Sequence, residues 1–311
     1  MIKLNILFLL RSALMLAVSA VALQGQALGQ KELQQLLDGN GPSTMNRASG
    51  DGFTEIDLSD FTEPFTETLY VRNQNIRFVN GTLTQAASFN GTLIVIQNGY
   101  ALDLASSAEL QGNGEQAAGF APLVKVNIGS LMVNGGEISG LGWLYSLPVY
   151  TNRALPPVYN DRTAVELTGG DHSVFTMSSG TVGGRVLNTE GGSVTIKGGV
   201  ICEIKTSEDF TLSGSAYLMG VELQDNAFVR LDSPLQHTLQ ISGYELDQVV
   251  AGGYTSIQGV SYNLQQSDVE NMELRDNTNN YKLSLEGNYV YVPTRRSSDL
   301  LLWKLPSILT A

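Results

Sequence analysis

The chain has 311 residues, of which 42% are hydrophobic and only 15% charged, and it contains 33 glycines. So little charge excludes a disordered chain, a coiled coil and a long surface helix, and the many glycines indicate an all-β protein with many turns. Lys and Arg number 18 against 30 Asp and Glu, which gives a net charge of −12. Without a basic stretch to offset this charge, we expect no nucleic-acid partner.

Residues 1–29 have the pattern of a secretory signal peptide. Lys3 and Arg11 are the only charged residues there, and the apolar run 12–23 is too short to span a bilayer. We therefore expect a secreted protein or one on the bacterial outer cell surface, with no transmembrane span after signal removal. The alternative is a short buried helix.

Residues 30–52 are predicted to form an N-terminal cap and a loop. Within 31–41, Leu33, Leu36 and Leu37 are spaced as on one face of a helix, and Gly39 can end it. A stack of strands has open edges at its ends, so we expect this helix to cover the first of them. The alternative is a disordered terminus.

One short pattern recurs between residues 53 and 250: apolar-x-apolar-x-Gly-Gly-x-apolar. Its clearest copies begin at 131 and 194, and weaker copies begin at 76, 94, 175, 210 and 239. The first two apolar residues share one side of a strand, and the glycine pair then turns the chain. Most steps are about 16 to 22 residues, or about twice that where a copy is missing, which favours windings of a parallel solenoid over the shorter strand repeat of a β-sandwich.

The repeat strings also carry a family resemblance. SLMVNGGEISG, VFTMSSGTVGG and SVTIKGGVICE resemble the coils of adhesin-like bacterial cell-surface proteins of the right-handed parallel β-helix, or pectate-lyase-like, superfamily. The resemblance covers about residues 50–250 and implies an all-β fold, a right-handed parallel β-helix with a short N-terminal helical cap. Its motif is structural, so it indicates the fold more strongly than the function.

Residues 140–162 interrupt the repeat, and long insertions of solenoids often form a binding face. Aromatic rings stack on sugar rings, and Arg and Asp can bond to sugar hydroxyls, so this composition predicts a glycan-binding site. The candidate ligand-binding residues are Trp143, Tyr145, Tyr150, Arg153, Tyr159, Asp161 and Arg162. The alternative is a loop whose aromatic residues pack back on the winding.

Catalytic chemistry has weaker support in the sequence. Lyases of this superfamily need carboxylates for Ca²⁺ and a basic residue, and hydrolases need two or three clustered carboxylates. We recognise no such cluster at equivalent positions of the repeat, and Asp171-His172 fits a solvated turn. We therefore predict no catalytic residue, metal site or cofactor. Cys202, the only cysteine, is expected to be a buried thiol.

Residues 251–292 depart from the repeat and are predicted to form C-terminal capping strands and a short helix. The helix should start near Ser267 or Asp268, and a hairpin should turn at Gly287. Residues 293–311 contain Arg295 and Arg296 in a run unlike the acidic body. We expect this tail to be non-native or disordered; the alternative is a genuine short tail.

These observations predict a non-enzymatic secreted or cell-surface protein, adhesin-like, that contacts a polysaccharide or a host or cell-surface glycan. One alternative is a polysaccharide lyase or glycoside hydrolase of the pectate-lyase-like superfamily. A second alternative is a structural spacer module of a larger surface protein. Carboxylates or basic residues aligned across neighbouring windings would favour the enzyme.

Overall fold

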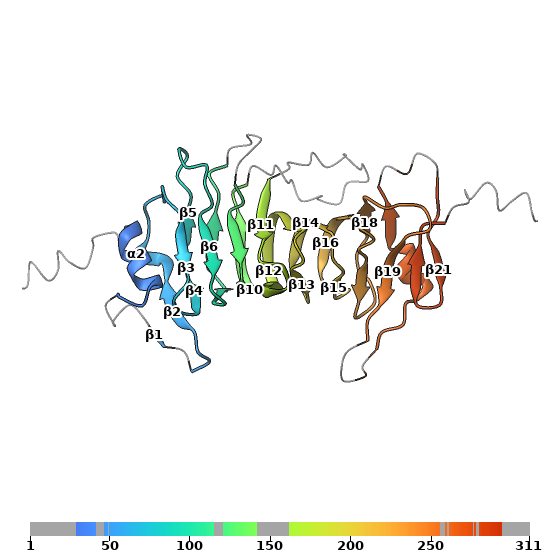
Figure 1. Cartoon of the computed structure of the whole chain (residues 1–311), viewed down its shortest axis with the longest axis horizontal. Helices are drawn as coiled ribbons and strands as arrows, with labels where there is room; N and C mark the ends of the chain where they lie inside the picture. Colours follow the sequence, from blue (N-terminus) through green and yellow to red (C-terminus); the bar gives the residue numbers. More distant parts are fainter. Residues whose placement is uncertain are drawn as a thin grey trace, which may run out of the picture.

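The computed structural model of the chain describes residues 29–41, 47–48, 50–114, 121–141, 162–255, 259, 261–275, 277 and 280–293. This part is 48% strand and 8% helix, which confirms the predicted all-β class. It is elongated, with the strands side by side along the long axis (Figure 1). None of its helices is both long enough and apolar enough to cross a membrane. Residues 1–28 of the predicted signal peptide and residues 294–311 lie outside it.

The strands pair mostly in parallel and form three rows along the molecule. Each circuit of the chain, which we call a winding, adds one strand to a row. Row 1 contains β2 (Thr54–Asp57), β4 (Ile76–Val79), β7 (Ala101–Ala105), the first part of β10 (Gly129–Ser139), the first part of β12 (Ser173–Asn188), β13 (Ser193–Ile196), β15 (Phe210–Leu212), β17 (Val229–Leu231) and β19 (Val249–Gly253).

The longer strands turn a corner, so a single strand can contribute to more than one row. Row 2 contains β5 (Thr82–Thr84), β8 (Glu109–Gln111), the later parts of β10 and β12, and the first parts of β14 (Val200–Thr206) and β16 (Tyr217–Leu223). Row 3 contains β3 (Leu69–Val71), β6 (Ile94–Gln97), β9 (Val124–Asn127), β11 (Thr163–Leu167), the ends of β12, β14 and β16, then β18 (Leu239–Ser242) and β20 (Met272–Leu274).

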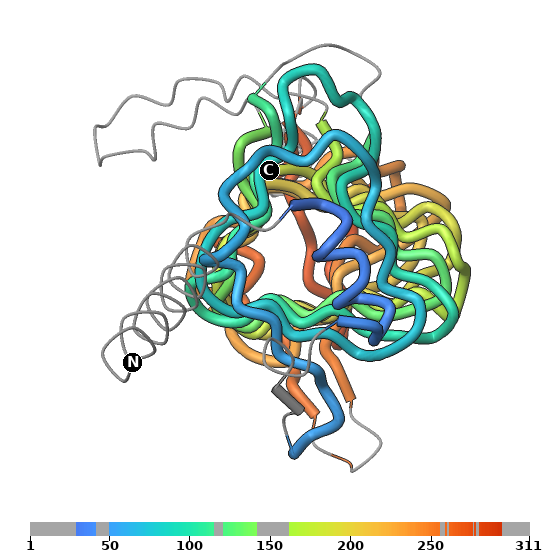
Figure 2. Tube along the Cα trace, turned by 90° about the vertical axis from the view of Figure 1, so that its left-hand side faces the viewer, coloured from blue at the N-terminus to red at the C-terminus, as the bar shows by residue number. Residues whose placement is uncertain are grey.

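The core lies inside the three rows and is built from aligned apolar side chains. In row 1, Val133 is in parallel register with Met177, and Met177 with Ile196. All three are at most 1% exposed. Seen along the axis in Figure 2, successive windings lie one behind another around this interior. The alternation of apolar and polar residues therefore places one side of every strand in a shared core, as strand geometry requires.

The repeat copies do not all belong to one row, which corrects the prediction that they mark successive windings. Ile94 pairs in register with Leu69 and Val124, so this copy lies in row 3. The copy beginning at Leu239 also lies in row 3. The reason is that an apolar strand followed by a tight turn is needed at more than one corner of a winding.

The early windings are also longer than the predicted 20 or so residues. Arg77 and its row-1 neighbour Asp103 are separated by 26 residues, whereas Arg185 and Glu203, later in the chain, are separated by 18. The extra length lies in the connections from row 2 to row 3. The winding length is thus set by loops at one corner, and the core register stays the same.

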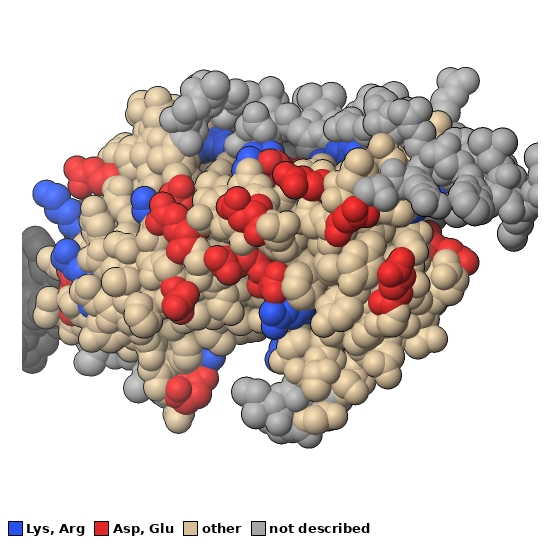
Figure 3. Space-filling model, turned by 45° about the vertical axis from the view of Figure 1, so that its right-hand side comes forward, with Lys and Arg blue, Asp and Glu red and all other residues tan. Residues whose placement is uncertain are grey.

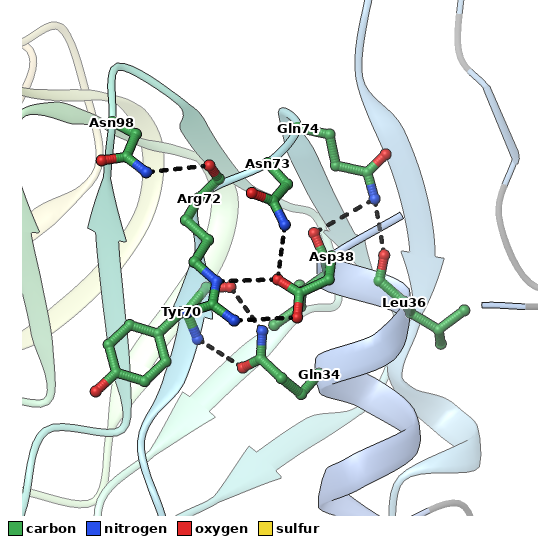
Figure 4. A network of polar contacts seen from close by, with 9 residues as sticks. Gln34, Leu36, Asp38, Tyr70, Arg72, Asn73, Gln74 and Asn98 are labelled. Carbon is green, nitrogen blue, oxygen red and sulfur yellow. Dashed lines mark hydrogen bonds and ion pairs between the residues drawn. The ribbon is translucent and has the colours of Figure 1, made fainter. Parts of the chain in front are cut away.

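The predicted N-terminal helix is present as α2 (Gln30–Leu37), with Leu33, Leu36 and Leu37 buried. Its Gln34 side chain meets the outer edge of β3, the first strand of row 3 (Figure 4). Gln34 Nε2 donates to the Tyr70 carbonyl at 3.1 Å, and the Tyr70 N–H donates to Gln34 Oε1 at 2.8 Å. A side-chain amide therefore satisfies the edge groups that a neighbouring strand would otherwise pair.

The end of α2 is attached to the same winding by ion pairing and hydrogen bonds. Arg72 Nε and Nη2 donate to the two Asp38 carboxylate oxygens at 3.1 and 3.2 Å. Gln74 Nε2 donates to the carbonyl of Leu36 at 2.7 Å, which satisfies one of the free carbonyls at the helix end. The other N-terminal edges carry β1 (Arg47–Ala48), antiparallel to β2, and the short 3₁₀ helix η2 (Leu58–Asp60) near β5.

The C-terminal end carries the predicted hairpin and short helix. β21 (Ser284–Glu286) and β22 (Tyr289–Tyr291) form the hairpin, and β22 pairs antiparallel with β19. The helix α3 (Gln266–Glu270) begins slightly before the predicted position, so Asp268 is its third residue. Asp268 is fully buried and accepts bonds from the Gln265 N–H, the Leu235 N–H and the Tyr262 hydroxyl.

Candidate functional site

The outer face of row 2 carries a regular array of polar side chains. In three successive windings an inward Leu or Ile is flanked by two outward polar residues, because neighbouring residues of a strand point to opposite faces. Thr82 is in register with Glu109, and Glu109 with Glu137. The second outward file contains Thr84, Gln111 and Ser139. Hydroxyl, amide and carboxylate groups thus recur at the strand spacing of about 4.8 Å.

Hydrogen bonds across the windings hold this array in place. Thr82 Oγ1 donates to Glu109 Oε2 at 3.0 Å, and Ser139 Oγ donates to Glu109 Oε1. Thr84 Oγ1 donates to Gln111 Oε1 at 3.1 Å. Bonds to a carboxylate are stronger than bonds between neutral groups, so they hold the Glu109 side chain in one position.

Glu137 lies directly beside Glu109 on the next winding and is exposed. Partial burial, followed by the nearby Glu109 carboxylate, raises the pKa of Glu137 above its usual value. An ordered carboxylate next to a carboxyl group that holds its proton more readily is the arrangement that acid–base chemistry uses. The same pair can also accept hydrogen bonds from the hydroxyls of a bound ligand.

A polar corner lies at the end of row 2, where the insertion leaves the winding. Arg162 is 7% exposed, and its Nη2 donates to Gln85 Oε1 at 2.8 Å. Its Nη1 donates to Asn113 Oδ1 at 2.9 Å. Leu141, near the start of the insertion, is buried two residues after Ser139. Both ends of the insertion are therefore anchored beside the row-2 array.

Comparisons with known proteins give no relative for this chain. No family model, no curated protein and no solved structure matches it.

Six of the seven residues predicted to bind a ligand lie outside the described part of the chain. They are Trp143, Tyr145, Tyr150, Arg153, Tyr159 and Asp161. The seventh, Arg162, is the buried guanidinium bonded to Gln85 and Asn113. Its bonds fix the start of β11, and a contact of Arg162 with a ligand stays a prediction.

Sequence reasoning missed the aligned pair Glu109 and Glu137. The signal was a polar–Leu/Ile–polar triplet that begins at 82, 109 and 137. The glycine-rich repeat includes Leu83 and Ile138 of these triplets but not Leu110, and its spacing indicates shorter windings, so it hides the alignment. Once the length of each winding is known, the three triplets can be placed in register with one another.

The other reactive side chains considered are either a buried thiol or residues of an exposed turn. Cys202 is 6% exposed, as predicted, and burial together with the Glu203 charge raises its pKa to about 12, so the thiol stays protonated. Asp171 and His172 lie exposed in the 3₁₀ turn η3 (Gly170–His172), as expected of a solvated turn. Across the described residues, no group of three or more His, Cys, Asp or Glu side chains could hold a metal ion.

Proposed function

We propose that the chain is an exported right-handed parallel β-helix that binds a glycan without altering it. The fold proposal is supported by three rows of parallel strands whose register repeats with every winding. Export is supported by the charged and apolar pattern of residues 1–29. The role is that of a secreted or cell-surface protein of adhesin-like type.

The observation that carries the binding proposal is the row-2 array beside the insertion. Glu109, Gln111, Glu137 and Ser139 present acceptors and donors at a fixed spacing on a flat face. The sequence of the insertion, whose described ends Leu141 and Arg162 lie near row 2, contains aromatic residues, including Trp143, of a kind that can stack on sugar rings. A glycan offers the complementary surface, with hydroxyls on its rim and C–H groups on its ring faces.

A glycan array followed by affinity electrophoresis in polysaccharide gels tests this proposal. The full chain should be retained by at least one glycan, and Trp143→Ala should weaken retention at least about tenfold, as for a central aromatic contact. Tyr289→Ala is the matched control, because Tyr289 is an aromatic residue, 45% exposed, in the C-terminal hairpin. If no glycan retains the protein, the binding role is wrong and a structural spacer module becomes the better reading.

The Glu109–Glu137 pair also favours a second candidate function, hydrolysis of a glycosidic bond. In this reading Glu137 is the general acid and Glu109 the nucleophile, and neighbouring windings about 4.8 Å apart suit the short carboxylate spacing of a retaining hydrolase. Release of reducing ends from any bound glycan, abolished in Glu137→Gln, would establish it. Unsaturated products would instead indicate a lyase.

A further inference from the structure

The charges of row 2 differ from those of row 3. In row 3, two of the acidic side chains are paired with lysines of neighbouring windings: Lys125 Nζ lies 3.5 Å from Glu166, and Lys205 Nζ lies 2.7 Å from Glu222. In row 2, the outward positions of the described strands contain Glu109 and Glu137 but no Lys or Arg. The described strands of row 2 therefore carry negative charge without a basic side chain among their own outward residues.

Hydrogen bonds hold the Glu109 side chain in place on row 2. Thr82 and Ser139 each donate to one of its carboxylate oxygens. Arg162, at the corner, is buried and directs its guanidinium to the amide oxygens of Gln85 and Asn113. No described basic side chain of row 2 is therefore placed to receive the carboxylate of a ligand.

We infer that Glu109 and Glu137 are specificity-determining residues that make row 2 select neutral glycans and reject polyuronates. This inference rests on the proposed glycan-binding function. A sugar hydroxyl can donate a hydrogen bond to either glutamate, and bonds to a charged acceptor are strong. A uronate carboxylate has no proton to donate, and its charge is repelled at the same place. Rejection by like charge is an efficient source of selectivity because it costs a competitor more than a lost contact would.

Polymers that share a backbone and carry either neutral or anionic substituents test the inference. We would compare methyl-esterified homogalacturonan with its de-esterified form, and hydroxyethyl cellulose with carboxymethyl cellulose. At low salt the neutral member of a retained pair should bind at least about tenfold more tightly, and added salt should narrow the difference by screening the repulsion. In the double variant Glu109→Gln, Glu137→Gln, the ratio of neutral to anionic affinity should fall by about tenfold.

The double variant Glu166→Gln, Glu222→Gln is the matched control, because it removes the same number of carboxylates from row 3, where Lys125 and Lys205 already balance them. Its affinity ratio should stay at the wild-type value. An anionic polymer that binds as tightly as its neutral partner would overturn the inference and leave glycan binding in place. An unchanged ratio in the double variant would also overturn it. Retention of no polymer at all would overturn both the inference and the proposed function.

Discussion

At the residue scale, Ile128 has an unfavourable backbone. It is the residue between β9 and β10, its φ is 58°, and its side chain is 45% exposed. A β-branched side chain in the left-handed region crowds the backbone and is rare. One winding earlier, Asn98 occupies the equivalent corner with φ 62°. Asparagine tolerates this conformation, so the earlier corner forms with less strain.

We therefore expect Ile128→Asn to stabilise the protein. Relief of the left-handed strain should raise the free energy of unfolding by about 1 kcal/mol, and little apolar burial is lost because the side chain is exposed. Urea denaturation of both proteins measures the change. The reverse substitution one winding earlier, Asn98→Ile, should lower the stability. If the Ile128→Asn protein were less stable, the isoleucine side chain would have to make a contact that stabilises the fold by more than the backbone strain destabilises it.

Glu137 predicts a pH-dependent stability. Its pKa is raised in the folded protein, so the folded state holds a proton more tightly than the unfolded state. The favourable contribution is complete below the usual glutamate pKa of about 4.3 and is lost as the pH rises through the raised value. Glu137→Gln should thus stabilise the protein at pH 7 by about 0.3 to 0.5 kcal/mol, a small value because the group is solvent-screened.

Chemical denaturation at pH 7 and near pH 4 checks this sign. The two proteins should differ at pH 7 and converge at the lower pH. Glu166→Gln should show no gain at pH 7, because that residue pairs with Lys125. If the higher stability of the Glu137→Gln protein persisted unchanged at low pH, charge repulsion would be excluded as the cause of the difference.

At the scale of elements, an arginine after β20 ties the C-terminal segment to row 3. Glu203 is 2% exposed and accepts from Arg185 Nε at 2.8 Å and from Arg275 Nη1 at 3.0 Å. Arg275 reaches Glu203 by passing over Gly220, which lies between Glu203 and Gln240 in the row. A Cβ on Gly220 would clash with Arg275 Nη2, so the end of the arginine side chain would have to move.

Gly220→Ala should therefore act by displacing Arg275. Loss of one of two partners of a buried carboxylate should lower the free energy of unfolding by about 1 to 3 kcal/mol. Arg275→Gln should lower it by a similar amount. The double variant should be little less stable than either single variant, because both substitutions remove the same interaction. Equilibrium unfolding of the three variants measures the coupling. Fully additive effects would show that Gly220 and Arg275 act independently.

The cap helix α2 gives a second prediction at this scale. Gln34→Ala removes the side chain that bonds to both backbone groups of Tyr70, so it should lower the stability by about 1 kcal/mol and promote aggregation through the exposed edge of β3. Gln35→Ala is the control, since Gln35 is the exposed neighbour on the same helix. Light scattering and denaturation should separate the two variants. Equal behaviour would mean that Leu33, Leu36 and Leu37 alone hold the cap.

The elements differ in how far local sequence determines them. The row-1 strands that begin a repeat copy, α2 and the C-terminal hairpin were predictable, because apolar spacing and turn residues act over a few positions. The alignment of Glu109 with Glu137 was not, since it depends on the length of the loops between rows 2 and 3. The contact of Arg275 with Glu203 joins residues 72 positions apart, and no local sequence pattern indicates it.

At the scale of the whole molecule, the stack of windings is closed at both ends. β1, α2 and η2 cover the N-terminal edges, and β22 and the segment around α3 lie at the C-terminal end (Figure 1). Acidic side chains are spread along the face drawn in Figure 3, in keeping with the net charge of −12. Covered edges and like charge both oppose end-to-end association.

Engineered disulfides test most directly the central claim that successive windings stack in parallel register. Thr176, Thr195 and Thr211 are outward neighbours on three consecutive windings of row 1. Cysteines at 176 and 195, or at 195 and 211, should cross-link, because adjacent strands lie about 4.8 Å apart. The pair 176 and 211 should stay reduced at about twice that distance, and the buried Cys202 should not interfere. A cross-link between 176 and 211, or none between neighbours, would contradict the stacked arrangement.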